Sequence, residues 1–151
     1  MNEAKLILLA DDSENDILLT RIALTKAGLV NPLREVHNGE AAIAYLKGEV
    51  PYGDRKEFPQ ATVLLLDLNM PRKNGFEVIR WVRSQPGLRR LTIYVTSASI
   101  REEDIKQAFD LGANAFLMKP GTLDDLIRMM QCMGTWMHYN QFPPLNDTPL
   151  H

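Results

Sequence analysis

Short apolar runs of strand length alternate along the chain with longer segments whose apolar residues recur at helical spacing. The most regular run, residues 63–67, has four apolar residues followed by Asp67. A run without polar alternation is typical of a strand that is buried on both faces, as in a parallel sheet flanked by helices. Four further strands are predicted at residues 5–10, 33–36, 91–96 and 115–118.

A helix is predicted after each of these strands. Ser13, with Asp16 three residues later, resembles a capping box at the start of the first helix, and Gly28 ends that helix. Thr122 and Asp125 resemble a second capping box, which begins a long last helix. The other helices are predicted over residues 38–48, between Gly75 and Pro86, and over residues 105–112, with a surface loop at residues 50–61.

Five alternations of strand and helix predict one α/β domain with a doubly wound (βα)5 fold. We expect a flavodoxin-like, five-stranded parallel sheet in the order 2-1-3-4-5, which binds ligands beyond the carboxyl ends of its strands. The 151 residues, of which 45% are hydrophobic and 24% charged, suffice for one domain with a full core. We expect this domain at residues 1–140, followed by a C-terminal tail at 141–151.

The composition excludes several classes of function. A net charge of -2 and a pI near 5.9 provide no basic field for nucleic acid, although Arg83, Arg89 and Arg90 are clustered. The single cysteine, Cys132, excludes an internal disulfide, and no zinc-binding pattern of Cys and His is present. The chain begins without a signal peptide, and no apolar run approaches the ~20 residues that span a bilayer. We therefore expect a cytoplasmic protein without nucleic acid or membrane as a partner.

Polar side chains stand at the ends of four predicted strands. Asp11 and Asp12 follow the first strand, Asp67 ends the third, Ser97 follows the fourth and Lys119 follows the fifth. Helix capping easily explains one of the two adjacent acids but not both. Because the carboxyl ends of parallel strands share one edge, we expect these five residues to lie close together.

Three carboxylates at one edge repel one another, so the site requires a cation. Hard oxygen ligands favour Mg²⁺. Lys119 and a small hydroxyl group supply the positive charge and the donor that a transferring phosphoryl group needs. An aspartate can itself accept phosphoryl to form an acyl phosphate, and Asp67, at the end of the central strand, is the best candidate.

The same residues carry a family resemblance. Asp11-Asp12, Asp67 with Asn69-Met70-Pro71 and Gly75, Ser97-Ala98, and Lys119-Pro120 occur in the order and spacing of a response-regulator receiver domain, which has a chemotaxis-regulator-like fold. The match covers about residues 4–139. The resemblance implies that Asp67 is phosphorylated and that Mg²⁺ is bound by Asp12, Asp67 and the backbone carbonyl of Asn69. Asp11 would act on the metal through water.

The resemblance also implies the phosphoryl and switch residues. Ser97 would bind a phosphoryl oxygen, and Lys119 would pair with the phosphoryl group. Thr96 is a rival for the hydroxyl role, but the spacing to Lys119 and the following Ala98 favour Ser97. Phe116, three residues before Lys119, occupies the position of the family's switch aromatic, although it could also be an ordinary core residue.

The long loop at residues 50–61 and the extension beyond the last helix resemble small stand-alone regulators of bacterial and cyanobacterial phytochrome histidine kinases. Such a protein accepts phosphoryl from a sensor histidine kinase, here a bacteriophytochrome, and signals through protein contacts. It catalyses its own phosphorylation and dephosphorylation but is not a classical enzyme. Trp136, Tyr139 and Phe142 add apolar surface near the C-terminus, from which we expect a homodimer. The alternative is that the tail folds back over its own domain.

Other functions fit the sequence less well. A haloacid-dehalogenase-like phosphatase also uses a strand-end aspartate with Mg²⁺, but it needs a second aspartate two residues later, where this chain has Asn69. A degenerate receiver that serves only as a binding scaffold would not need the full set of acids, hydroxyl and lysine. A phosphorelay intermediate would use the same residues and stays open.

Overall fold

The computed structural model describes residues 5–145 and contains five strands and five helices that alternate along the chain. In chain order they are β1 (Ile7–Ala10), α1 (Glu14–Lys26), β2 (Leu33–Val36), α2 (Gly39–Lys47), β3 (Val63–Asp67), α3 (Gly75–Ser84), β4 (Thr92–Ser97), α4 (Glu102–Leu111), β5 (Ala115–Met118) and α5 (Leu123–Tyr139). None of the helices within residues 5–145 is both long enough and apolar enough to cross a membrane.

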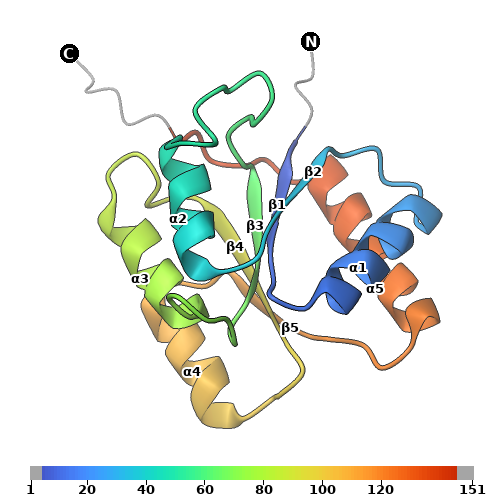
Figure 1. Cartoon of the computed structure of the whole chain (residues 1–151). Coiled ribbons are helices and arrows are strands. Elements are labelled where there is room, and N and C mark those ends of the chain that lie inside the picture. The colour runs from blue at the N-terminus through green and yellow to red at the C-terminus, as the bar shows by residue number, and fades with distance from the viewer. Residues whose placement is uncertain (1–4, 146–151) are drawn as a thin grey trace.

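The strands form one parallel sheet in the order β2-β1-β3-β4-β5, which confirms the predicted fold and strand order (Figure 1). Every residue of β1 and β3 is buried. At the last step of the ladder, Asp67 of β3 lies in register with Thr96 of β4. The sheet therefore presents the ends of its buried central strands at one edge.

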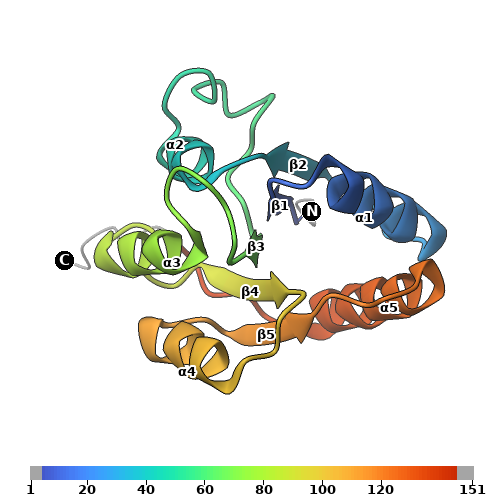
Figure 2. The same ribbon diagram turned by 60° about the horizontal axis from the view of Figure 1, so that its bottom comes forward.

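Helices cover both faces of the sheet. Helices α1 and α5 lie together on one face, and α2, α3 and α4 cover the other (Figures 1 and 2). The strand side chains alternate between two hydrophobic clusters: Leu8 and Leu64 belong to the cluster under α2 to α4, whereas Leu9 and Leu65 belong to the cluster under α1 and α5. Because each strand meets apolar residues on both faces, its sequence shows no polar alternation.

Two strands differ at their ends from the predicted ranges. Strand β1 begins at Ile7, two residues later than predicted, and the side-chain ammonium group of Lys5 donates a hydrogen bond to the carbonyl of Met137, at 2.7 Å. Strand β4 lies one residue further along the chain than predicted, so Ser97 is its last residue. The backbone of Ser97 thus belongs to the sheet.

Both predicted capping boxes are only half formed. The Ser13 and Thr122 hydroxyls accept hydrogen bonds from the backbone N–H groups of Asp16 and Asp125. The carboxylates of these aspartates, however, pair with Lys119 and Arg128. A reciprocal box occurs instead at the start of α3, between Asn74 and Glu77.

The loop between α2 and β3 is anchored by its own side chains. The rings of Tyr52 and Phe58 pack against each other and against Tyr45 of α2. Arg55 donates to the carbonyl groups of Tyr45 and Leu46, at the end of α2, and to that of Phe58. The long loop thus closes over the C-terminus of α2, at the amino edge of the sheet.

The C-terminal segment packs on the domain itself as far as it is described. Phe142 contacts the hydrophobic cluster under α1 and α5, and Leu145 contacts the cluster under α2 to α4. Lys5 lies over the ring of Phe142, 5.1 Å from its centroid. Residues 140–145 therefore cross the amino edge of the sheet, while Trp136 and Tyr139 of α5 are 57% and 75% exposed.

Candidate functional site

Three aspartates meet at the carboxyl edge of the sheet. Asp11 and Asp12 follow β1 and Asp67 ends β3, and one carboxylate oxygen from each lies within 4.8 Å of the others. Asp11 and Asp67 are buried, whereas Asp12 is exposed. The predicted acid cluster is thus assembled, with two carboxylates at its base and one at its rim. Its oxygen ligands suit a hard divalent cation such as Mg²⁺ or Mn²⁺.

Backbone N–H groups orient the two buried carboxylates. The N–H of Ser13 donates to Oδ1 of Asp11 at 2.9 Å, and the N–H of Asn69 donates to Oδ1 of Asp67 at 3.3 Å. Each bond spans two residues and forms where the chain turns away from its strand. The Oδ2 atoms of both aspartates then face Lys119.

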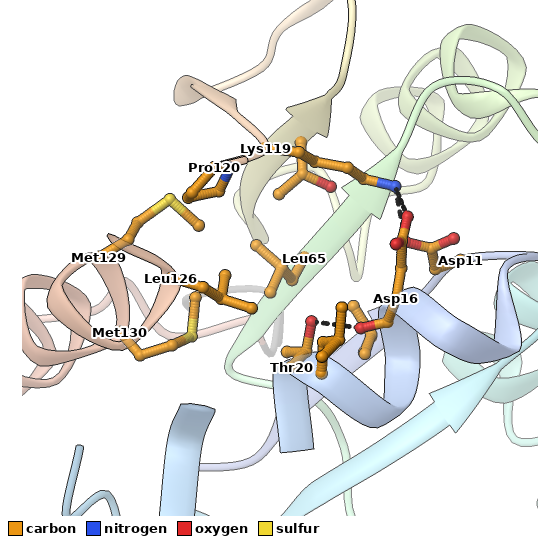
Figure 3. Close-up of a pocket in the computed structure, with 12 residues that line it drawn as sticks. Asp11, Asp16, Thr20, Leu65, Lys119, Pro120, Leu126, Met129 and Met130 are labelled. Carbon is orange, nitrogen blue, oxygen red and sulfur yellow. Dashed lines mark hydrogen bonds and ion pairs between the residues drawn. The ribbon is translucent and has the colours of Figure 1, made fainter. Parts of the chain in front are cut away.

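Lys119 is held between β5 and α5 by its own backbone, whose N–H donates to the carbonyl of Ser97 at 2.8 Å. Its Nζ atom lies 2.9 Å from Oδ2 of Asp11 and 2.8 Å from Oδ2 of Asp16 (Figure 3). The distance from Nζ to Oδ2 of Asp67 is 3.6 Å. The lysine therefore forms hydrogen bonds with Asp11 and Asp16, but it is only a neighbour of Asp67.

Negative charge dominates the site. Burial raises the pKa of Asp67 to about 6; Lys119 opposes this rise, while repulsion from Asp11 adds to it. Burial alone would lower the pKa of Lys119, but its hydrogen bonds with Asp16 and Asp11 outweigh burial and raise the pKa above its ordinary value. Lys119 thus stays positively charged. The ionised form of Asp67 destabilises the folded protein until a further cation binds at the site.

The loop after β3 has little freedom because its backbone packs closely against two glycines. A Cβ atom at Gly75 would lie 2.7 Å from the carbonyl oxygen of Asp67, and one at Gly39 would lie 1.9 Å from the carbonyl oxygen of Lys73. Arg72 and Lys73 have positive φ angles of 48° and 70°. These left-handed residues are docked on the N-terminus of α2, where the N–H of Glu40 donates to the carbonyl of Arg72.

The predicted hydroxyl and switch residues lie on β4 and β5, the strands that follow β3 in the sheet. Thr96 and Ser97, at the end of β4, are both buried. Thr96 lines a cavity of about 60 Å³ beside Lys119, and the Ser97 hydroxyl accepts a hydrogen bond from the N–H of Ser99. Phe116 of β5 is half-buried against the cluster under α2 to α4.

The sequence did not point to Asp16 as a site residue. Its place in a capping box explained it locally, whereas the structure brings its carboxylate to Lys119 from 103 positions away. The one available signal was its place in the first turn of the helix that follows Asp11 and Asp12.

Several known proteins are similar to this chain in sequence and in fold. The family model of the response regulator receiver domain matches residues 7–131. The response regulator Rcp1 of Synechocystis sp. is 34% identical over 130 residues, which cover 86% of this chain and 86% of Rcp1. The Mn²⁺-bound form of Rcp1 superimposes with a TM-score of 0.80 at 32% identity, covering 92% of this chain and 99% of that one.

Two further solved structures are similar over nearly their whole length. The phosphorylated cyanobacterial phytochrome response regulator RcpA has a TM-score of 0.85 at 32% identity, covering 93% of this chain and 99% of that chain. A response regulator in red light signalling of R. palustris has a TM-score of 0.87 at 31% identity, with 92% and 98% covered. Together with the strand order and the assembled acid cluster, these matches show that the chain belongs to the response regulator receiver domain family.

Proposed function

We propose that Asp67 is the phosphoacceptor of this receiver domain. One of its carboxylate oxygens attacks the phosphorus of a phosphohistidine, and the P–N bond breaks as the P–O bond forms. The single observation that carries the proposal is the convergence on Asp67 of two further aspartates and a lysine, at the edge of a buried central strand. An acyl phosphate at this place would be flanked by both the metal ligands and the compensating cation.

The divalent cation of the proposed reaction is Mg²⁺. Asp12, Asp67 and the backbone carbonyl of Asn69 would bind it directly, and Asp11 would act through water. The donor set of three carboxylates within 4.8 Å supports this assignment, as does the Mn²⁺-bound structure of Rcp1. When bound, the cation neutralises charge on the phosphoryl oxygens and on Asp67, whose pKa burial raises to about 6.

Ser97 and Lys119 serve the transferred group. Lys119 pairs with a phosphoryl oxygen, and the Ser97 hydroxyl exchanges its bond with the N–H of Ser99 for a bond to another phosphoryl oxygen. When Ser97 moves, space opens beside β4 for Phe116, which is now half-buried. Phosphorylation would thereby alter the surface formed by α4, β5 and α5.

The phosphoryl donor is a sensor histidine kinase, and we propose a bacteriophytochrome acting in the cytoplasm. The similarity to RcpA and to the regulator in red light signalling of R. palustris supports a phytochrome. Signalling then proceeds through protein contacts. The long anchored loop after α2 lies away from the acid cluster, so it leaves the acceptor edge accessible to a kinase.

The proposed chemistry is tested by transfer of labelled phosphate from an autophosphorylated histidine kinase, or from a small phosphodonor, with and without Mg²⁺. The wild type should be labelled only when Mg²⁺ is present, and Asp67→Asn should not be labelled. Asp110→Asn, an exposed acid on α4, serves as the control and should label like the wild type. Stoichiometric labelling of Asp67→Asn would overturn the assignment. A wild type that binds Mg²⁺ but resists every donor would favour a binding scaffold.

We further propose a homodimer formed through the C-terminal face. Phe142 and Leu145 are engaged within their own domain, so the support comes from exposed Trp136 and Tyr139 on α5 and exposed Met118 on β5. Sedimentation at about 50 µM, a concentration at which a micromolar dimer is well populated, should show a dimer for the wild type and a monomer for Tyr139→Glu. A wild-type monomer both with and without a phosphoryl mimic would exclude the dimer.

A further inference from the structure

Lys119 is held by two carboxylates of different kinds. Asp11 belongs to the acid cluster, whereas Asp16 lies on the first turn of α1, outside it. Both accept hydrogen bonds from Nζ, at 2.9 and 2.8 Å, while Oδ2 of Asp67 at 3.6 Å lies beyond hydrogen-bond distance. Figure 3 shows the lysine reaching across the carboxyl edge toward these two aspartates. One of the two hydrogen-bond partners of the proposed phosphoryl-binding cation is thus a residue that has no other place in the reaction.

We propose that Asp16 is a positioning residue that restrains Lys119 and thereby weakens the binding of a phosphoryl group at Asp67. The inference rests on the proposed function, because it concerns how readily that same site takes up phosphoryl. The reason is a competition for donors. A lysine has three N–H donors, and Asp11 and Asp16 occupy two of them. These two bonds hold Nζ at 3.6 Å from Oδ2 of Asp67, so they must loosen before the lysine can move toward a phosphoryl group there.

The two competing carboxylates do not behave alike when the site is filled. Asp11 lies among the proposed metal ligands, so a bound cation offsets its charge. Asp16 lies 2.8 Å from Nζ but outside the cluster, so a cation bound by the cluster does not offset its charge in the same way. Asp16 is therefore the competitor that persists in the loaded site, and it lowers the positive potential that Lys119 offers to an incoming anion.

The carboxylate of Asp16 can be changed without disturbing the helix that carries it. The cap of α1 uses the backbone N–H of Asp16, which donates to Ser13, and the Thr20 hydroxyl donates to the backbone carbonyl of Asp16. Neither bond involves the side chain. Asp16→Asn keeps the shape of the side chain and removes only its charge, so α1 should form as before.

The test is a titration of Mg²⁺-loaded protein with beryllium trifluoride, an anion that mimics a phosphoryl group on a carboxylate, followed by ¹⁹F NMR. Asp16→Asn should bind the anion about three- to tenfold more tightly than the wild type, the scale of one partly exposed, charge-assisted hydrogen bond. The Mg²⁺ affinity should stay equal or fall, because removal of a nearby negative charge cannot strengthen cation binding. A purely structural role for Asp16 would weaken anion binding.

Two variants separate the local contact from a general effect of charge. Glu14→Gln removes an exposed charge from the same turn of α1 and should leave the anion affinity unchanged. Asp16→Glu restores the charge and should return the affinity toward that of the wild type. Equal gains in Glu14→Gln and Asp16→Asn would overturn the proposal, as would an Asp16→Asn affinity no higher than that of the wild type.

A second measurement needs no phosphoryl chemistry. In a crystal structure of Asp16→Asn, Nζ of Lys119 should move within hydrogen-bond distance of Oδ2 of Asp67, from the present 3.6 Å. An unmoved lysine would refute the restraint even if the anion binds. If the lysine moves but neither protein takes up the anion, the restraint stands and the proposed phosphoacceptor is wrong.

Discussion

At the amino ends of the strands, two arginines donate to backbone carbonyl groups, whereas at the carboxyl ends one lysine faces three carboxylates. Arg83 donates to the carbonyls of Gly112 and Leu91, at 2.6 to 3.0 Å, and Arg55 caps the end of α2. These cations satisfy helix C-termini, where positive charge is favourable. Lys119, in contrast, cannot neutralise its surroundings. The charged groups at the amino ends of the strands thus have their partners within the protein. The carboxylates at the carboxyl ends keep an excess of negative charge until a cation binds.

The largest effect on stability should come from removing an arginine at the amino ends of the strands. Arg83→Ala leaves the half-buried carbonyls of Gly112 and Leu91 without their charged donor, so we expect a loss of about 3 kcal/mol in the free energy of unfolding. Arg83→Lys should recover only a minor part, because an ammonium group lacks the fork that reaches both carbonyls. Urea denaturation measures both, with exposed Arg80→Ala as the control. A loss under 1 kcal/mol would mean that this end does not depend on the arginine.

A somewhat smaller loss of stability is expected from displacing the loop that follows Asp67 at the carboxyl ends of the strands. Gly39→Ala places a Cβ atom 1.9 Å from the carbonyl oxygen of Lys73, so the loop that follows Asp67 must move. We expect a loss of about 2–3 kcal/mol, in the range of overpacked sites, together with weaker Mg²⁺ binding. Gly87→Ala, where a Cβ atom meets open space, is the matched control. Unchanged Mg²⁺ binding would show that the loop adjusts independently of the site.

Neutralising one carboxylate at the carboxyl ends of the strands should stabilise the metal-free protein. Asp67→Asn removes a carboxylate whose pKa burial raises to about 6, and we expect a gain of about 1–2 kcal/mol at pH 7.5 in EDTA. Because the folded-state pKa lies above that of the unfolded chain, the cost of Asp67 exists above pH 6 and disappears as the pH falls toward 4. The gain should therefore vanish at pH 4. A gain that persists there would have another cause.

The smallest effect is that of the ligand itself. Mg²⁺ at ten times its dissociation constant should stabilise the wild type by about 1.4 kcal/mol, through mass action on the folded state. Asp67→Asn should respond much less, since one of the proposed ligands is altered. Thermal melting with and without Mg²⁺ measures the difference. Ca²⁺ and Na⁺ at matched ionic strength separate site binding from general screening.

The sequence predicted the parts of the molecule that depend on local patterns. Residues 63–67 and 115–118 form strands with the predicted bounds, because unbroken apolar runs leave few alternatives. The convergence of Asp11, Asp12, Asp67 and Lys119 was also predictable, since parallel strands bring their carboxyl ends to one edge.

The remainder depends on contacts between distant segments. Asp16 had a sufficient local explanation as a capping residue, so nothing in the pattern assigned its carboxylate to Lys119. Similarly, Phe142 and Leu145 could have faced either a partner or their own domain, and apolar character alone does not decide between these surfaces. The roles proposed for Ser97 and Phe116 stay predictions until a phosphorylated form is compared.

The packing of α1 on α5 has a consequence for biosynthesis. The two helices cover one face of the sheet from opposite ends of the chain, and Lys5 bonds to Met137 across 132 positions. During translation, the apolar side of α1 therefore has no helical neighbour until the last part of the domain has left the ribosome. Contacts so distant in sequence slow folding and expose apolar surface meanwhile. Nascent chains of this protein should thus engage chaperones through α1 until α5 is released.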